Sequence, residues 1–193
     1  MMLWNRAVWA ALAMSVAGAT GCASQRQDMH RGLETMRRES TPSELEARGE
    51  AFAALGDMTR AEQYFVAALK AGGESGALVR RLVAVCVADG RYPVALEYAE
   101  DYLRNHPNDA DVRYVTATVR AALGDVEGAR QSLRSVLASR PELVDAHYAL
   151  AIIERDGGDA VAADEQFRHY LRLSPNGPRA EVARANLMQS VPQ

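Results

Sequence analysis

The sequence predicts an all-α protein made of four helix–turn–helix repeats and a C-terminal capping helix. The first observation is a period, because glycines recur every 34 residues at Gly56, Gly90, Gly124 and Gly158. The second is that an alanine follows each glycine after five positions and a leucine after thirteen. The third is composition: helix-favouring residues dominate, and aromatic residues make up only 6%. A period of about 20 to 50 residues is typical of stacked helical units.

The first 21 residues are predicted to be a targeting segment that is removed, and not a part of the fold. Arg6 supplies a positive start, and an uncharged, mostly apolar run follows over residues 7–17. This run is too short to span a bilayer as a helix. Small residues then lead up to a cysteine, in the order Ala19-Thr20-Gly21-Cys22.

This tetrapeptide resembles the lipobox of bacterial lipoproteins, although the pattern prefers leucine where Ala19 stands. The resemblance implies cleavage before Cys22 and acylation of its sulfur and new amino group with chains such as palmitate. Ala23 follows the cysteine in place of aspartate, which resembles the sorting pattern for the outer membrane in bacteria with two membranes. The implied location is the cell envelope, on the periplasmic face of the outer membrane. The alternative is a simple secretory signal that is cut after Ala19.

The segment that precedes the repeats is polar. Residues 22–41 begin with the cysteine that would carry the lipid and contain Met29, Leu33 and Met36 at helical spacing. They form either a short amphipathic helix against the first repeat or a flexible tether. Lipidation of Cys22 leaves Cys86 as the second of two cysteines, so we expect no disulfide and interpret Cys86 as a small buried hydrophobic residue.

The period places four helix pairs between residues 42 and 177. In each pair the glycine ends the first helix, called helix A, where a left-handed backbone has little steric cost without a Cβ atom. The next residue is aspartate in three repeats and is expected to cap the second helix, helix B. The repeats are predicted at 42–75, 76–109, 110–143 and 144–177. The A helices are predicted at 43–55, 77–89, 111–123 and 145–157, and the B helices at 58–71, 92–105, 126–139 and 160–173.

The remaining repeated residues have packing roles. The alanine lets helices A and B approach closely, the leucine fills the core between repeats, and a proline marks the turn out of helix B in three repeats. Ser43 and Glu46 suit a capping box for the first helix. Pro178 opens a ninth helix, predicted at 178–189 within the C-terminal segment 178–193, with Val182, Ala183 and Leu187 on one side.

Together these residues resemble the tetratricopeptide repeat, whose A helices line a concave groove. The matching positions lie ten, six and three residues before each glycine. They imply a peptide groove that includes Arg80, Tyr114, Thr118, Tyr148, Ile152 and Arg155. Glu46 and Glu50 make the N-terminal end acidic, where the Lys/Asn clamp of chaperone-binding members would need the opposite charge. The alternative for Tyr114 and Tyr148 is simple packing between helices.

One position departs from the family pattern. Four residues before each glycine the family usually carries a large aromatic residue, and this chain carries Phe52, Cys86, Arg120 and Glu154. The two charged residues occupy the same phase of adjacent repeats. Either both reach the edge of the core or they form an ion pair with each other.

Several function classes are excluded or disfavoured. A net charge of −3 provides no basic field for nucleic acid, and two cysteines exclude a four-cysteine zinc site. No catalytic motif is present, so we predict a non-enzymatic protein with no catalytic residues, no cofactor and no small-molecule substrate. Glu165 and His169 lie four residues apart and suit a metal, but a third ligand is missing, so no metal site is predicted.

Binding therefore remains as the expected function. The resemblance implies a lipid-anchored scaffold that binds a peptide segment of an envelope protein, similar to the assembly factors and pilotins of type IV pili and secretins. An adaptor or regulator of envelope proteases or cell-wall hydrolases is the main alternative. A metal-binding protein or enzyme that uses Glu165 and His169, and a self-associating structural protein, are further alternatives.

Overall fold

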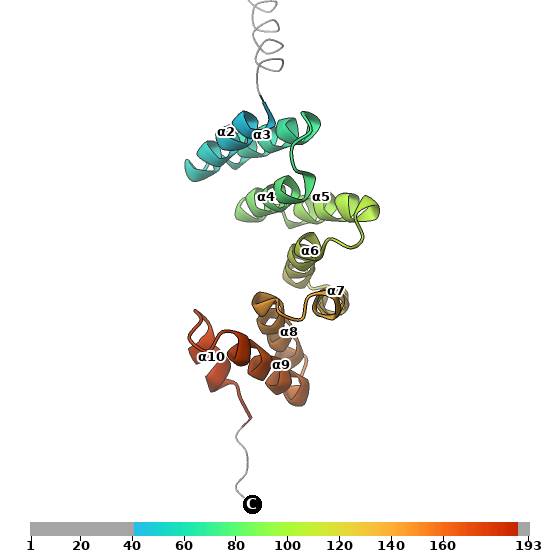
Figure 1. Cartoon of the computed structure of the whole chain (residues 1–193), viewed down its shortest axis with the longest axis vertical. Helices are drawn as coiled ribbons and strands as arrows, with labels where there is room; N and C mark the ends of the chain where they lie inside the picture. The colour runs from blue at the N-terminus through green and yellow to red at the C-terminus, as the bar shows by residue number, and fades with distance from the viewer. Residues whose placement is uncertain (1–40, 189–193) are drawn as a thin grey trace, which may run out of the picture. The chain divides into compact units, whose positions relative to one another are not determined.

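The computed structural model describes residues 41–188, and these residues form helices with no strand (Figure 1). The predicted signal segment, Cys22 and nearly all of the segment before the repeats lie outside the described residues. The helices are α2 (Pro42–Ala54), α3 (Met58–Lys70), α4 (Ser75–Ala88), α5 (Tyr92–Asn105), α6 (Ala110–Ala122), α7 (Val126–Ser139), α8 (Val144–Asp156), α9 (Ala160–Leu173) and α10 (Ala180–Ala185). The all-α repeat prediction is confirmed, with helix ends shifted by a residue or two.

The helices pack as successive pairs. Helices α2, α4, α6 and α8 are the A helices, and each packs against the B helix that follows it in the chain. Each B helix then contacts the next A helix, and α4, α6 and α8 also contact one another in sequence. Three adjacent A helices therefore present residues of the same phase side by side.

The turns inside the pairs follow the predicted chemistry. Gly56 and Gly124 have φ angles of 79° and 85°, in the left-handed region where a side chain is strained. Asp57 Oδ1 then accepts a hydrogen bond from the backbone N–H of Arg60 at 2.9 Å, as a helix cap does. The second repeat has Arg91 at this position and no side-chain cap.

The capping box at the start of α2 lies two residues before the predicted one. The Thr41 hydroxyl accepts from the backbone N–H of Glu44 at 3.3 Å, and the Glu44 carboxylate accepts from the backbone N–H of Thr41 at 2.8 Å. Pro42 explains the shift, because proline suits the first helical position, where its missing N–H is not needed. Glu46, the predicted partner of Ser43, pairs with Arg81 instead.

The repeated alanines lie where helices A and B meet most closely. Ala61, Ala95 and Ala129 are fully buried, and Ala163 is nearly so. In the first pair, Gly49 faces Phe65, and a Cβ at Gly49 would come within 2.5 Å of the ring. The repeated leucines are half-buried and pack against the cores instead of filling them.

The C-terminal cap is shorter than predicted. Helix α10 ends at Ala185, where the 178–189 prediction expected a longer helix. The chain leaves the helix because the Asn186 side chain donates to the Val182 carbonyl at 2.8 Å, while the Met188 backbone N–H donates to Asp164 Oδ1 at 2.7 Å. Ala183 is buried as expected, but Val182 faces solvent.

Of the two alternatives for Arg120 and Glu154, the ion pair between them is wrong. Arg120 donates to Glu100 on α5 at 2.7 Å, and Glu154 accepts from Arg130 and Arg134 on α7 at 3.0 and 2.8 Å. Each side chain thus contacts the B helix of the preceding repeat and not its counterpart. Glu154 is only 3% exposed and lies in the core, whereas Arg120 reaches its edge as the alternative predicted.

Cys86 is buried in α4, as predicted. Burial, with a smaller effect of the nearby Glu62 carboxylate, raises the pKa of the Cys86 thiol to about 11. The thiol therefore stays protonated and unreactive at neutral pH. No helix within residues 41–188 combines the length and the apolar character that crossing a membrane requires.

Candidate peptide-binding face

The six predicted groove residues lie on three A helices, each of which contacts the next. Arg80 comes from α4, Tyr114 and Thr118 come from α6, and the other three come from α8. We use the name A-helix face for the positions ten, six and three residues before each repeat glycine. Its members are Glu46, Glu50, Ala53, Arg80, Ala84, Val87, Tyr114, Thr118, Ala121, Tyr148, Ile152 and Arg155.

The centre of the A-helix face is made of small side chains. Ala84 and Thr118 are exposed, and Val87 and Ala121 beside them are half-buried. The Thr118 hydroxyl donates to the Val115 carbonyl of its own helix at 2.8 Å, so it does not project as a free polar group. This part of the face therefore leaves room for a chain that lies across α4 and α6.

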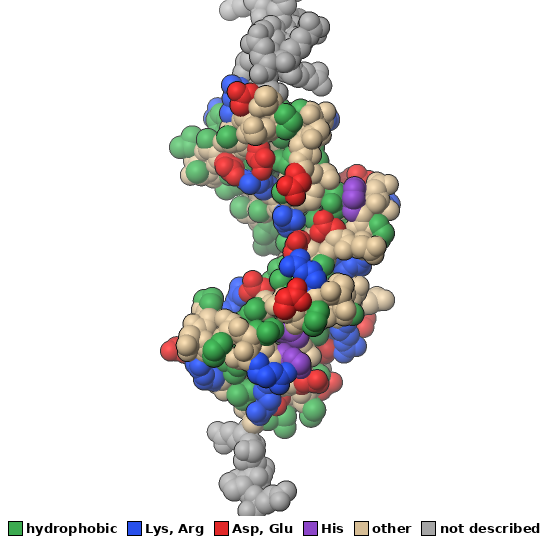
Figure 2. All heavy atoms as spheres, in the orientation of Figure 1, with side chains coloured by type: hydrophobic (Ala, Val, Ile, Leu, Met, Phe, Trp, Pro, Cys, Tyr) green, Lys and Arg blue, Asp and Glu red, His purple; other side chains and the backbone are tan. Residues whose placement is uncertain are grey.

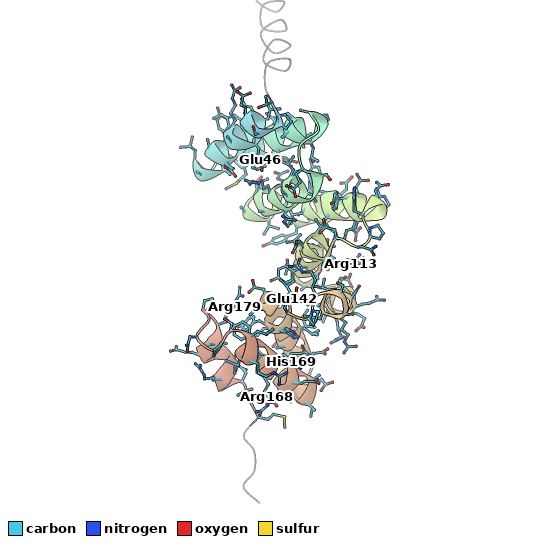
Figure 3. All side chains as sticks on the ribbon, in the orientation of Figure 1. Glu46, Arg113, Glu142, Arg168, His169 and Arg179 are labelled. Atoms are coloured by element: carbon cyan, nitrogen blue, oxygen red, sulfur yellow. The ribbon has the colours of Figure 1, made fainter. Side chains whose placement is uncertain are left out.

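The N-terminal end is less acidic than predicted. Arg81 Nη2 lies 2.9 Å from Glu46 Oε1, and the other Arg81 nitrogen pairs with Glu50. Figure 3 labels Glu46 on α2, the helix that also carries Glu50. One net negative charge remains on the three side chains. Sequence reasoning missed Arg81 because it compared only positions of the same phase, and Arg81 lies one residue beyond that phase.

Arg80 differs from the other charged members of the face. It is half-buried, and no carboxylate of residues 41–188 lies within ion-pair distance of it. The pKa of the nearby Tyr102 is raised, mainly by burial and by its 2.9 Å hydrogen bond to Asp109. The positive charge of Arg80 opposes this rise, so Arg80 lies near Tyr102 without pairing with Asp109.

The C-terminal end is closed by the cap. The Arg179 guanidinium lies 5.0 Å from the centre of the Tyr148 ring and pairs with Asp145. The rings of Phe167 and Tyr170 contact Tyr148 edge-on, with centroids 6.0 and 5.4 Å away. Figure 3 shows Arg179 at the start of the cap. Sequence reasoning considered only the apolar residues of this helix and so missed this contact.

The remaining predicted residues are partly engaged. Tyr114 is half-buried, and burial together with the Asp145 charge raises its pKa, while Arg179 opposes the rise. Ile152 packs against the core of the last repeat. Arg155 is exposed, pairs with Asp156 at 2.8 Å and donates to Asn186 at 3.2 Å. Binding through any of the six residues stays a prediction.

His169 packs against another histidine, whereas the Glu165 side chain is exposed. His169 Nε2 lies 3.9 Å from Glu165 Oε1, and Arg172 donates to His169 Nδ1 at 2.7 Å. The His169 ring stacks on the His147 ring at 5.0 Å with an angle of 7°. Among residues 41–188, no three His, Cys, Asp or Glu side chains are grouped as metal ligands would be.

We expect the stability of the protein to fall as the pH drops through the titration range of His169. Burial, the Arg172 charge and the His147 charge hold its pKa below the ordinary 6.5, and Glu165 opposes them less strongly. The unfolded chain therefore binds the proton more readily, so the contribution is present above pH 6.5 and is lost below it. Unfolding in urea between pH 8 and 5 should show a smaller decrease for Arg172→Gln. An equal decrease in both proteins would contradict this.

The charged side chains on the visible surface are mixed. Figure 2 shows Lys or Arg and Asp or Glu interspersed on that side of the molecule, with no large patch of one sign. A surface of this kind favours specific pairing with a partner over a long-range field.

Comparisons with known proteins agree on the repeat. A family model described as tetratricopeptide repeat matches residues 46–110, 85–142 and 114–178. No curated protein gives a significant match.

Solved structures share the fold. A tetratricopeptide repeat protein from Parabacteroides merdae is 23% identical with a TM-score of 0.65, over 75% of this chain and 58% of the other. YrrB, described as a TPR protein with an unusual peptide-binding site, is 21% identical with a TM-score of 0.64, over 85% and 87%. MamA from Desulfovibrio magneticus is 23% identical with a TM-score of 0.61, over 81% and 94%. The chain thus spans just over half of the first of these proteins.

Proposed function

Because the chain belongs to the tetratricopeptide repeat family, we propose that it is a lipid-anchored scaffold of the cell envelope. Proteins of this family bind peptides or other proteins and are generally not enzymes. In our proposal lipid on Cys22 holds the chain at the outer membrane, and the A-helix face binds an extended segment of an envelope protein. The role we assign is the assembly of an envelope complex such as a pilus or a secretin.

The observation that carries the binding proposal is the open centre of the A-helix face. Ala84 and Thr118 are small, exposed side chains on two A helices that contact each other, so no long side chain of these two positions stands where an extended segment would cross. Larger side chains flank this centre, with Arg80 on α4 and Tyr114 on α6. Arginine and tyrosine are the residue types that most often anchor protein interfaces.

The anchoring proposal rests on the sequence around Cys22. Residues 23–40 separate this cysteine from the first described residue, Thr41. A chain of that length spans at most about 60 Å when fully extended. The proposal therefore allows the repeats to meet a partner at some distance from the membrane surface.

The binding proposal is tested by filling the centre of the face. We expect Ala84→Gln combined with Thr118→Gln to reduce partner recovery from envelope fractions by about tenfold or more, because long side chains then occupy the path of the segment. Both positions are exposed, and glutamine is a good helix former, so the helical signal and thermal midpoint should stay unchanged. Quantitative mass spectrometry of proteins captured with the full-length chain provides the measurement.

A matched control introduces two glutamines on another helix. Ala138→Gln with Ser135→Gln changes two exposed residues of α7, the third B helix, and should leave recovery unchanged. Equal recovery by all three proteins would place the binding surface elsewhere. The tyrosines suit this test less well, because Tyr148 packs against Phe167 and Tyr170, and its truncation would open a cavity.

A further inference from the structure

We propose that Arg80 binds the carboxylate of an acidic side chain within the segment bound on the A-helix face. This inference rests on the proposed function and names the chemistry of the partner. It starts from the ion pairs around the face. Among the described residues, Arg80 is the cationic member of the face that has no carboxylate within 4 Å, since Arg155 pairs with Asp156.

The acidic groups near the face already have other partners, and Asp109 accepts from the Tyr102 hydroxyl and from the backbone N–H of Val112, both at 2.9 Å. Glu46 and Glu50 pair with Arg81. At the first turn of the next A helices, Asp111 pairs with Arg140 at 2.6 Å and Asp145 pairs with Arg179. The chain itself therefore supplies no carboxylate to Arg80 within residues 41–188.

The position of Arg80 makes an external carboxylate favourable. A half-buried guanidinium has lost part of its hydration, and a carboxylate restores those contacts through two parallel, charge-assisted hydrogen bonds. The same pair in open solvent would contribute little. A bound segment would itself exclude water from Arg80, which strengthens the pair further.

The surroundings of Arg80 indicate an acidic residue inside a segment and not at its end. The A-helix face continues on both sides of α4, toward α2 and toward α6. Ala84 follows Arg80 after one turn of α4, and it and Thr118 at the matching position of α6 are small, whereas Tyr114 of α6 shares the phase of Arg80. An extended chain can therefore pass through. The one net negative charge left on Glu46, Glu50 and Arg81 disfavours a second acidic residue toward α2.

The test uses a display library of random twelve-residue peptides selected on the full-length protein in detergent. We expect wild type to enrich peptides with an internal aspartate or glutamate. Arg80→Gln should weaken such a peptide by about tenfold or more, as should the matching Asp→Asn change in the peptide. The two changes together should cost no more than either alone. Arg48→Gln, at an exposed arginine of α2, is the control and should change nothing.

The outcomes separate this inference from the proposed function. Acidic peptides that bind Arg80→Gln as well as wild type would overturn the inference. Peptides without acidic residues that lose binding only in the Ala84→Gln, Thr118→Gln variant would also overturn it, and would leave the A-helix face as the binding site. A library in which no peptide depends on that face would overturn both.

Discussion

A Cys22→Ala variant is expected to leave the membrane fraction almost completely, whereas wild type is recovered with the outer membrane. The physical reason is covalent lipid. Each CH₂ group buried in a bilayer contributes about 0.8 kcal/mol, so one acyl chain holds a protein only marginally while several chains on one residue hold it effectively irreversibly. Fractionation after a high-salt wash, followed by immunoblotting and by labelling with a palmitate analogue, measures both location and acylation.

The second cysteine provides the control for this experiment. Cys86→Ala also removes a thiol, but from a buried position on α4, and it should stay with the membrane. A Cys22→Ala protein that still sediments with outer membranes in high salt would contradict the lipid anchor. A wild-type protein found soluble in the periplasm would instead favour a secretory signal cut after Ala19.

A Glu154→Arg variant is expected to lose much of its stability. Glu154 is 3% exposed and accepts hydrogen bonds from Arg130 and Arg134. Charge reversal would place a third guanidinium beside Arg130 and Arg134 and remove the carboxylate that they share, and an uncompensated buried charge commonly costs about 3–5 kcal/mol. For a chain of this size that shifts the thermal midpoint down by roughly 10 °C. Thermal unfolding followed by circular dichroism measures the shift.

Two further variants make this prediction specific. Glu154→Leu should change the midpoint less, because Arg130 keeps its pair with Glu127 and the Arg134 side chain is 61% exposed, so neither guanidinium is left buried without a partner. Glu165→Arg reverses an exposed glutamate on the next helix and should also have little effect. Equal midpoints for wild type and Glu154→Arg would mean that Glu154 is not in the core.

The fold could be predicted because its determinants are local and repeated. A glycine that needs φ > 0, an aspartate that caps the next helix and an alanine at the helix contact each act within one pair. Four copies of the same pattern then placed each helix to within a residue or two. The start of α2 was misplaced because Thr41 competes with Ser43 as the cap, and only Pro42 decides between them.

The contacts of the candidate site could not be predicted in the same way. The matched phase placed Arg80, Tyr114 and Thr118 on neighbouring A helices, as the structure does. The partners of charged residues depend on how far long side chains reach between helices, which periodicity does not encode. Arg130 illustrates this, because it lies on a B helix and contacts the buried Glu154 of the next repeat.

The cap shows a second limit. Its apolar residues predicted a helix that extends to 189, but the helix ends at Ala185, where the Asn186 side chain donates to Val182 and the Met188 N–H donates to Asp164. The bond between Met188 and Asp164 joins residues far apart in the sequence. The bond from the Asn186 side chain to Val182 competes with the backbone hydrogen bonds of the helix. The contact of Arg179 with Tyr148 arises from the same docking of the cap.

The central claim, that this lipid-anchored protein binds a partner segment on its A-helix face, is tested most directly by photo-cross-linking in living cells. A photoreactive amino acid replaces Thr118 in the centre of the face or, in a separate strain, Ser135 on the exposed side of α7. The account predicts a discrete cross-linked envelope protein from position 118 that disappears when Cys22 is replaced by alanine. Cross-links from position 135 alone, or adducts at 118 that persist without Cys22, would contradict it.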